Sequence, residues 1–513
     1  MQLSNRSLVF SLLLAFVLSQ YACKKTDDIT GGTVANNSDI SSVYTSGTPE
    51  GGTETAYNED DLIENSAFTS VVNIQYGSEI VVANPLENNG VSVTVNGGDV
   101  TVESTVKEVE YVLTGTTAGG SFKIYSSNKF KLTLDNISIT SSNGPAINIQ
   151  SSKRVFVNVP ENTSSSLTDA AIYTEVAGED MKATLFSEGQ LIFTGSGNLS
   201  VAGRYKHAIA SDDYIRVVNT NITIPSAVTD GIHTNDAFIA DGGSFNITAE
   251  SDGIECEEGF IVINDGVFVL NTGDDGIAAS YEDGDAAITP YVTINNGDIT
   301  VNSAAGEGIE SKSVLTINNG KIVTNTADDG LNAGTAIYIN GGDIYSKSTG
   351  NDAMDSNGTF TITGGKVVAV GSGQPEGGID ADNNTFKITG GIVVGIGGTT
   401  TSPTASVSTV PGVIMGAGEA SKIVHIEDAD GNEVLTFLAP VSYSTLLFAS
   451  SKMKTNTTYT VYTGGSVTGG TDFYGLYTSG TYSGGVSGST FTTSGMVTQI
   501  GGSTGPGGGG GRP

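Results

Sequence analysis

Apolar and polar residues alternate in short runs along most of the chain, as in the segment Val91-Ser-Val-Thr-Val95. From Tyr57 onward, no segment keeps an apolar period of about 3.6 residues over the length of a helix. Short alternating runs bounded by glycine and asparagine are typical of β-strands joined by tight turns. The pattern therefore predicts an almost purely β protein.

A corner motif of an acid, a glycine and an apolar residue recurs along the middle of the chain, beginning with Asp230-Gly-Ile. Aligned on the residue before the apolar one, its copies are spaced by 22, 23, 32, 22, 23 and 25 residues, at Gly231, Gly253, Gly276, Gly308, Gly330, Ala353 and Gly378. A second ladder of turn glycines keeps the same period, at Gly243, Gly266, Gly297, Gly320, Gly342, Gly365 and Gly391. Both ladders share one long interval, which places an inserted loop at residues 281–290.

A unit of 22 to 23 residues with two or three short strands is too small to bury its own apolar side chains. Stacking the units in register creates one continuous apolar column, in which equivalent residues of adjacent coils lie about 4.8 Å apart. The turn glycines supply the positive φ that each corner requires. The repeat therefore predicts a right-handed, single-stranded parallel β-helix, a solenoid with a small C-terminal β cap.

The composition divides the chain into six predicted segments. Residues 1–22 form a lipoprotein-type signal peptide, and residues 23–58 form a disordered tether because they contain almost no apolar cluster. Residues 59–169 form irregular N-terminal coils, and residues 170–398 form the regular β-helix with the acidic corner. Residues 399–465 form the β cap, and residues 466–513 form a flexible tail rich in glycine, serine and threonine.

The first residues have the features of an export signal. Arg6 precedes an apolar run at residues 8–18, and the small Ala22 precedes Cys23. This stretch resembles a bacterial lipoprotein signal, although Gln20 stands where a leucine is usual. The interpretation predicts a secreted protein, lipid-anchored through Cys23 at the outer membrane or cell surface of a Gram-negative bacterium. An uncleaved anchor and ordinary secretion remain alternatives. With Cys23 lipidated, Cys256 has no disulfide partner and is expected in the interior.

The charge is strongly acidic, with 55 acids against 22 bases and a net charge of −33. Residues 230–391 hold 25 acids, five lysines and no arginine. This balance disfavours nucleic acid and anionic membrane surfaces as direct partners. The membrane is expected to hold the protein only through the lipid anchor, and the chain is expected to be a monomer. Hard cations are the partners that such a segment favours.

Stacking the coils predicts two ladders of polar side chains on either side of an inward-pointing apolar residue. The first ladder contains Asp230, Asp252, Asp275, Glu307, Asp329 and Asp352. The second, three residues further on, contains His233, Glu255, Ala278, Glu310, Asn332, Asp355 and Asp380. Carboxylates about 5 Å apart need either raised pKa values or bound cations.

Calcium, which takes six to eight oxygen ligands, fits such a corner. Zinc prefers histidine and cysteine, and the three histidines, at positions 207, 233 and 425, are predicted to form no cluster. A solvated acidic edge without bound ions remains an alternative.

The corner motifs, the Gly-Gly turns and the segments YVLTGTTAGGSFKI and KIVHIEDADGNEVLTF resemble a family of secreted bacterial β-helix proteins. That family is described as carbohydrate-binding-domain-containing, and its coils are similar to those of the pectate lyase superfamily. The resemblance covers residues 60–465 and implies calcium at the acidic corner and binding of plant cell-wall polysaccharide, polygalacturonate or cellulose, without cleavage. The calcium ligands that it implies are Asp252, Glu255, Asp274, Asp275, Glu307, Glu310, Asp328, Asp329, Asp352 and Asp355. The ladders add Asp230 and Asp380.

Two other functions remain open. A calcium-dependent uronate lyase needs a base to remove a proton from the sugar, and Lys312, close to Glu310, is the best candidate for that base. A surface adhesin or spacer needs no glycan. The chain has no tryptophan, so aromatic stacking on sugar depends on tyrosines, of which Tyr281 and Tyr291 bracket the inserted loop and are candidate glycan contacts.

Overall fold

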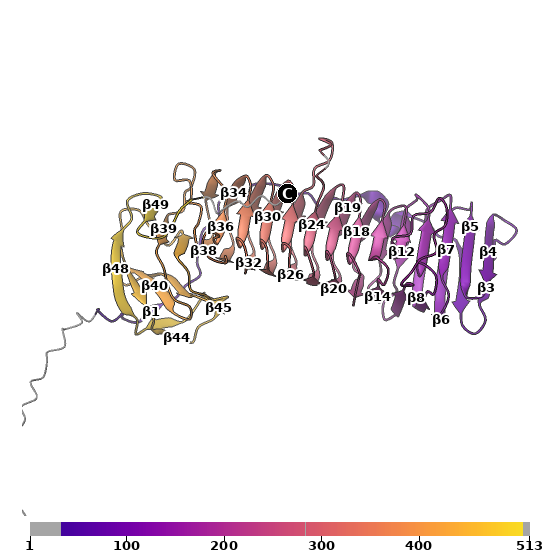
Figure 1. The fold of residues 1–513 in the computed structure, drawn as a ribbon, viewed down its shortest axis with the longest axis horizontal. Coiled ribbons are helices and arrows are strands. Elements are labelled where there is room, and N and C mark those ends of the chain that lie inside the picture. The colour runs from indigo at the N-terminus through magenta and orange to yellow at the C-terminus, as the bar shows by residue number, and fades with distance from the viewer. Residues whose placement is uncertain (1–31, 283, 506–513) are drawn as a thin grey trace, which may run out of the picture.

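A computed structural model describes residues 32–282 and 284–505 and shows an elongated stack of parallel strands with a mixed β cap at its C-terminal end (Figure 1). The predicted parallel β-helix is therefore confirmed. The described residues form no α-helix, only the short 3-10 helices η1 (Glu59–Asp61) and η2 (Ile63–Asn65). Within these residues, no helix has the length and apolar character needed to cross a membrane.

One face of the solenoid is a 13-stranded sheet that carries the second ladder of polar side chains. Its order from the N-terminal end is β4 (Val91–Asn96), β5 (Asp99–Ser104), β7 (Phe122–Ser126), β9 (Ile147–Gln150), β12 (Ala183–Ser187), β15 (His207–Ser211), β18 (Ile232–Thr234), β21 (Ile254–Cys256), β24 (Ile277–Ala279), β27 (Ile309–Ser311), β30 (Leu331–Ala333), β33 (Met354–Ser356) and β36 (Ile379–Asp380). The pairings are parallel except for the β4–β5 hairpin at the N-terminal end.

A second stack follows the first in each regular coil. It comprises β3 (Val81–Ala83), β2 (Ser70–Tyr76), β6 (Val109–Thr117), β8 (Phe130–Thr140), β10 (Val155–Asn158), β13 (Leu191–Thr194), β16 (Tyr214–Val217), β19 (Ala237–Ala240), β22 (Phe260–Ile263), β25 (Val292–Ile294), β28 (Val314–Ile317), β31 (Ala336–Ile339), β34 (Thr359–Ile362) and β37 (Phe386–Ile388). The long strand β8 pairs with both β10 and β11, so it joins the second stack to the third.

The third stack completes each coil. It comprises β11 (Ser164–Thr168), β14 (Asn198–Ala202), β17 (Asn221–Ile224), β20 (Ser244–Ala249), β23 (Val267–Thr272), β26 (Asp298–Ser303), β29 (Lys321–Thr326), β32 (Asp343–Ser348), β35 (Lys366–Val370) and β38 (Ile392–Gly397). At its C-terminal end, β42 (Thr445–Ser450) pairs antiparallel with β38 and with β39 (Gly412–Met415), and β49 (Val497–Gln499) joins β39. The open end of the parallel stack is thereby covered, as solenoids require.

The apolar residues of successive coils stack into a continuous core. Ile254 pairs with Ile277, and Ile277 with Ile309, and all three side chains are fully buried. The glycine before each of them permits the close approach of the coils. A Cβ atom on Gly253 would lie 2.5 Å from the carbonyl oxygen of Gly276 in the next coil. The corner motif therefore combines a core residue with the one residue type that leaves room for the neighbouring backbone.

The C-terminal cap extends further than the sequence indicated. Two small sheets build it, one from β45 (Asp472–Phe473), β46 (Leu476–Tyr477), β41 (Glu433–Leu438), β40 (Ile423–Asp428), β43 (Thr458–Thr463) and β48 (Val486–Thr492), the other from β1 (Ser38–Asp39), β47 (Thr481–Ser483) and β44 (Ser466–Thr468). Residues 466–505, predicted as part of a flexible tail, thus contribute six short strands, β44 to β49. The rest of that predicted tail, residues 506–513, lies outside the described residues. Sparse side chains such as Leu476, Tyr482 and Phe491 are buried among the cap strands, and they compensate for the glycine-rich composition.

The described part of the predicted tether is also ordered, which corrects that prediction for residues 32–58. It begins at the cap, where β1 pairs with β47, and then runs along the outside of the coils. We call residues 45–56 the strap. The carbonyl oxygen of Thr45 accepts the Gly391 amide at 2.9 Å, and that of Ala56 accepts from Arg216 at 2.6 Å.

A ladder of asparagine amides holds the strap. The side-chain amides donate to strap carbonyl groups in the pairs Asn264 with Thr55, Asn295 with Glu54, Asn318 with Gly52 and Asn340 with Glu50, at 2.9, 2.8, 3.0 and 2.7 Å. Each of these side-chain amides also donates to a side chain of the preceding coil, as that of Asn318 does to Asn295 at 2.9 Å. The strap is therefore ordered by hydrogen bonds from the coils and not by apolar residues of its own.

Replacing Asn318 and Asn340 with alanine should release the strap while the coils stay folded. Each lost hydrogen bond is worth roughly 0.5–1.5 kcal/mol. Amide hydrogen exchange should therefore accelerate in residues 45–56 and stay slow in the core strands. Asn325→Ala is the matched control, because Asn325 belongs to an exposed asparagine ladder and bonds to Asn302. Unchanged exchange in the double variant would contradict this account of the strap.

Two other sequence predictions concern cysteines. The signal peptide, residues 1–22, and Cys23 lie outside the described residues, so lipidation stays a prediction. Cys256 is buried in β21, and its thiol lies 3.4 Å from the carbonyl oxygen of Asn235. Its predicted interior position is confirmed.

Candidate cation and glycan site

The second ladder of polar side chains has the predicted register. Strand pairing aligns Glu255 with His233 and with Ala278 on either side. The alignment continues through the following coils without a shift, through Glu310, Asn332, Asp355 and Asp380. The predicted stacking of polar side chains is therefore present, with Ala278 as its one gap.

The first ladder is held by hydrogen bonds between coils. The backbone amide of Asp275 donates to the Oδ1 atom of Asp252 at 2.8 Å, and the amide of Glu307 donates to Asp275 Oδ1 at 2.7 Å. The same bond joins the Asp352 amide to Asp329 Oδ1 at 3.0 Å. The aspartates of the first ladder thus each support the next coil through one oxygen atom, which orients the carboxylate along the corner.

Burial disfavours the ionised form of several acids in the first ladder. Asp329 and Asp352 are 2% and 4% exposed. Burial, followed by the charges of Asp355 and Asp352, raises the pKa of Asp329 to about 10. Burial also raises the pKa of Asp352 to about 8, even though the Gly377 amide opposes the shift. Nearer the N-terminal end, burial and the charge of Asp230 raise the pKa of Asp252 to about 8. A bound cation would oppose these shifts, because its positive charge favours the ionised form of the carboxylates around it.

The strongest candidate for a calcium site lies at the C-terminal end of the corner. One carboxylate oxygen from each of Asp352, Asp355 and Asp380 lies within 4.8 Å of the others. The Oδ1 atom of Asp355 is buried and has no hydrogen-bond partner, and burial and the charge of Asp380 raise the pKa of Asp355 to about 7. Among the described residues, neither Asp352 nor Asp355 pairs with a lysine or arginine. Such a donor set fits calcium.

The middle of the corner carries one positive charge. The Lys312 Nζ atom lies 2.7 Å from Glu310 and 3.1 Å from Glu282 of the inserted loop. Burial opposes the charge on Lys312, but hydrogen bonds and the charges of these two acids raise its pKa above the ordinary value. Beside it, burial and the charge of Glu307 raise the pKa of Asp275.

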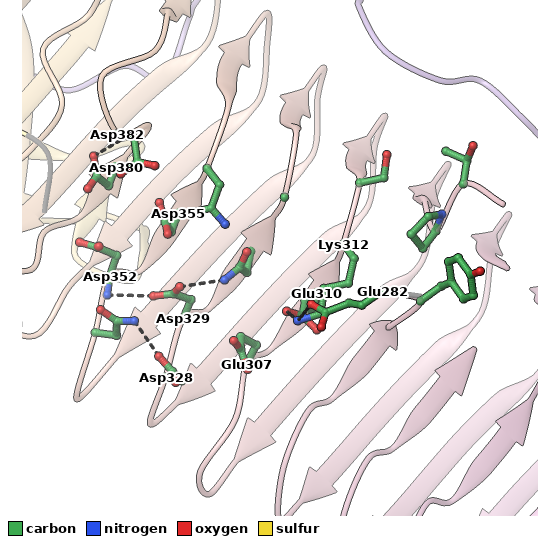
Figure 2. A pocket seen from close by; sticks show the side chains of 18 of the residues that line it. Glu282, Glu307, Glu310, Lys312, Asp328, Asp329, Asp352, Asp355, Asp380 and Asp382 are labelled. Atoms are coloured by element: carbon green, nitrogen blue, oxygen red, sulfur yellow. Dashed lines mark hydrogen bonds and ion pairs between the residues drawn. The ribbon is translucent and has the colours of Figure 1, made fainter. Parts of the chain in front are cut away.

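A groove of about 830 Å³ runs over this part of the corner, between the coils and the inserted loop. Figure 2 shows acidic side chains converging on it from successive coils. The acids that line it are Glu282, Asp285, Glu307, Glu310, Asp328, Asp329, Asp352, Asp355, Glu376, Asp380 and Asp382. Among the described lining residues, Lys312 is the only base. The groove is therefore lined mainly by acids, a composition suited to cations.

The predicted site residues do not all meet in this groove. Asp230, Asp252 and Glu255 form a separate group near the N-terminal end, with one ligand atom from each within 4.8 Å of the others. Asp274 is exposed at a turn and does not line the groove. Tyr281 lines the groove, whereas Tyr291 lies outside the lining and stacks on Phe260 with ring centroids 4.9 Å apart.

Sequence reasoning missed the loop acids Glu282 and Asp285 and three residues of the coils. Asn351 and Glu376 occupy the position before the first ladder, which also holds Asp328, and a third alignment of the repeat could have found them. Asp382 follows Asp380 in a turn that the repeat does not contain, so no periodic signal marks it. The prediction that the histidines form no cluster is wrong, because His207 and His233 meet at Asp230.

The fold and the corner define a class: a parallel β-helix whose acidic corner is suited to cations beside an open groove. Comparison with known protein families identifies the family within this class. The chain belongs to the family described as carbohydrate-binding domain-containing protein, whose model matches residues 91–377, more than half of the chain. The family resemblance seen in the sequence is thereby confirmed.

One relative in sequence and one solved structure are similar to part of the chain. A carbohydrate-binding domain-containing protein of Acetivibrio thermocellus is 29% identical over 118 residues, which is 22% of this chain and 41% of the relative. The chain thus matches less than half of that relative's length. A solved structure described as a polysaccharide lyase-like protein from C. thermocellum, a gadolinium derivative, is 20% identical with a TM-score of 0.40, covering 57% of this chain and 96% of that one.

Proposed function

We propose that this protein binds acidic polysaccharide in the groove beside the inserted loop, through calcium ions held at the acidic corner. The observation that carries the proposal is the Asp352, Asp355 and Asp380 group, whose oxygen atoms converge within 4.8 Å beside the groove. Family membership supports carbohydrate as the ligand. Calcium and the acidic character of the glycan follow from the charge of the groove.

Calcium accounts for the burial of so many acids. Its oxygen ligands can come from carboxylates, amide side chains and backbone carbonyl groups in flexible geometry. We propose that the two ladders supply these ligands, with Asp352, Asp355 and Asp380 as the first site to fill. Further ligands are the remaining ladder acids Asp230, Asp252, Glu255, Asp275, Glu307, Glu310 and Asp329, with Asp274 and Asp328 at the adjoining turns. A bound ion supplies positive charge to a wall that otherwise repels uronates.

The groove has a shape suited to a chain-like ligand. Its lining comes from successive coils and from the inserted loop, so a linear glycan can lie along the solenoid axis (Figure 2). Calcium ions along the ladders would then contact the carboxylates of successive sugars. Tyr281 lines the loop side of the groove and offers a ring to a sugar face. Tyr291 has a smaller role in this proposal, since it packs on Phe260.

The same geometry favours binding over cleavage. A uronate lyase needs a base that accepts a proton from the sugar. Residues 230–391 contain no arginine, and Lys312 is the one lysine or arginine among the described residues that line the groove. Lys312, the candidate base, contacts Glu310 and Glu282, which favour its protonated form. We therefore propose retention of the polysaccharide without a chemical step.

Retention on polysaccharide should depend on calcium and on glycan charge. The purified chain is mixed with pectate, pectin or cellulose, in calcium or in EDTA, and absorbance is followed for unsaturated products. We expect retention on pectate in calcium, loss in EDTA, weaker retention on pectin, and no new absorbance. New absorbance would establish a lyase. Failure of the folded, calcium-loaded protein to bind any of the three would contradict the proposal and favour an adhesin or spacer.

A further inference from the structure

At the N-terminal end of the corner, histidines take the place of acids in both ladders. Ile209 pairs with Ile232, so His207 occupies the position that Asp230 holds one coil later. His233 occupies the position of Glu255 in the second ladder. Two imidazole rings therefore enter an otherwise oxygen-rich corner in two adjacent coils, β15 and β18.

These side chains converge on one carboxylate. The Oδ2 atom of Asp230 lies 2.8 Å from His207 Nδ1 and 3.2 Å from His233 Nδ1. Glu255 adds a second carboxylate, with its Oε2 atom 3.0 Å from His233 Nδ1. The two rings stack with centroids 4.3 Å apart and planes at 20°. One ligand atom from each of His207, Asp230 and His233 lies within 4.8 Å of the others.

The group is buried and has one ring nitrogen without a partner. His207, Asp230 and His233 are 3%, 4% and 6% exposed. The Nδ1 atom of His207 faces Asp230 and the Thr229 hydroxyl, whereas its Nε2 atom is buried with no hydrogen-bond partner. When Nδ1 carries the proton toward Asp230, Nε2 presents an unpaired lone pair in the interior. Buried polar atoms usually have a partner, so Nε2 is a second place at this ring for a water or ligand, apart from the two Nδ1 atoms that converge on Asp230.

We propose that His207, Asp230 and His233, joined by Glu255, bind one divalent transition-metal ion of the zinc class. Imidazole and carboxylate ligands together suit Zn²⁺ and its neighbours, with nitrogen bonds near 2.0–2.1 Å after modest closure of the group. Calcium prefers oxygen ligands alone, so the same corner discriminates between two metals along its length. The inference goes beyond the proposed glycan binding and does not depend on it.

A zinc-class ion at the histidine group would lie next to one of the groups of oxygen ligands. Asp230 and Glu255 also belong to the neighbouring oxygen group with Asp252. A zinc-class ion at the histidines would neutralise these two shared carboxylates. It would thereby mark the N-terminal limit of the calcium-binding part of the corner.

Cobalt is a spectroscopic probe for this site. The full chain, prepared without a histidine tag and kept in excess calcium, is titrated with Co²⁺. We expect one ion per chain with visible absorption of a nitrogen-ligated, low-coordination centre, displaced by Zn²⁺ and not by further Ca²⁺. His207→Gln and His233→Gln should each weaken Zn²⁺ binding by at least about 10–100-fold. Loss of a group that only supports a metal ligand already weakens binding by that much.

The third histidine provides the matched control. His425 lies in the cap beside Glu427 at 2.9 Å, outside the group, so His425→Gln should keep the cobalt spectrum. Circular dichroism verifies that each variant is folded. Absence of Co²⁺ and Zn²⁺ binding in calcium would overturn the proposal and leave protonated His233 as the internal cation of the group. Equal Zn²⁺ affinity in the folded histidine variants would overturn it too, because the ion would then sit on carboxylates.

Discussion

Without calcium, the protein should lose stability as the pH rises from about 5 to about 9, and calcium should suppress that loss. The acids of the corner hold protons in the folded chain that they release on unfolding. Burial raises the pKa of Asp355 to about 7, that of Asp352 to about 8 and that of Asp329 to about 10. The corner acids therefore contribute most stability below their ordinary pKa values near 4, and lose it as the pH rises through the raised values.

The size of the effect follows from the shifts. Each pKa unit corresponds to about 1.4 kcal/mol, so several coupled acids make the loss on the order of several kcal/mol. His233 adds to the same trend, because hydrogen bonds and charges of Asp230 and Glu255 outweigh its burial and raise its pKa to about 9. Calcium at the Asp352, Asp355 and Asp380 group should leave that histidine contribution in place, because His233 contacts Asp230 and Glu255 and none of those three acids. Calcium binding should also release protons, since its ligands must be deprotonated.

Thermal unfolding is followed by circular dichroism across this pH range, in EDTA and in calcium. It measures the loss of stability with rising pH and the suppression of that loss by calcium. A pH indicator in weak buffer records the protons released when calcium is added. A midpoint in EDTA that stays level or rises between about pH 5 and about pH 9 would contradict the buried-acid account. In that case the corner would be a solvated edge whose carboxylates titrate normally.

Replacing Asp352 and Asp355 with asparagine should have opposite effects with and without calcium. In EDTA at about pH 8 the double variant should be more stable than the parent by roughly 1–3 kcal/mol, because two buried acids with raised pKa values no longer ionise. Asparagine keeps an oxygen atom that can accept the Gly377 amide, which Asp352 binds through Oδ1. In calcium the order should reverse, since one site filled at 100 times its Kd stabilises by about 2.7 kcal/mol.

Calcium titration by calorimetry, together with unfolding in both conditions, tests the reversal. Asp298→Asn is the matched control: Asp298 is exposed on β26 and lies 3.5 Å from Lys321. Its loss should change stability by less than about 1 kcal/mol, and calcium affinity should stay the same. If the double variant were less stable in EDTA and bound calcium like the parent, the carboxylates would be structural hydrogen-bond acceptors and not metal ligands.

The regular coils could be predicted because the same residue types recur at the same positions of every unit. The corner motif recurs at a constant period. Only stacking in register buries its apolar residue, lets the backbones approach at its glycine and places its acid at the corner. The pairings of Ile254 with Ile277 and of Asp355 with Asp380 follow from that period alone. Even the irregular interval predicted its loop, and Tyr281 and Glu282 of that loop line the groove.

Segments without the repeat were predicted less well. The strap has hardly any apolar residues, and its order depends on amides such as Asn318 and Asn340, more than 250 residues away in sequence. The cap strands of residues 466–505 depend in the same way on the burial of scattered side chains such as Tyr482. The composition of a segment shows how much apolar surface that segment can bury by itself. It does not show the hydrogen bonds and packing contacts that distant parts of the chain provide.

The amino-acid sequence by itself determined the β-helix, the two polar ladders and the acidic character of the corner, because these follow from period and residue type. Only the tertiary structure decided which side chains form a site. Described residues of the inserted loop form part of the groove lining. The histidine group forms because His207 lies one coil before Asp230, at a ladder position where the sequence has no acid. Distances of a few ångströms between coils determine ligand sets, and no spacing along the chain specifies them.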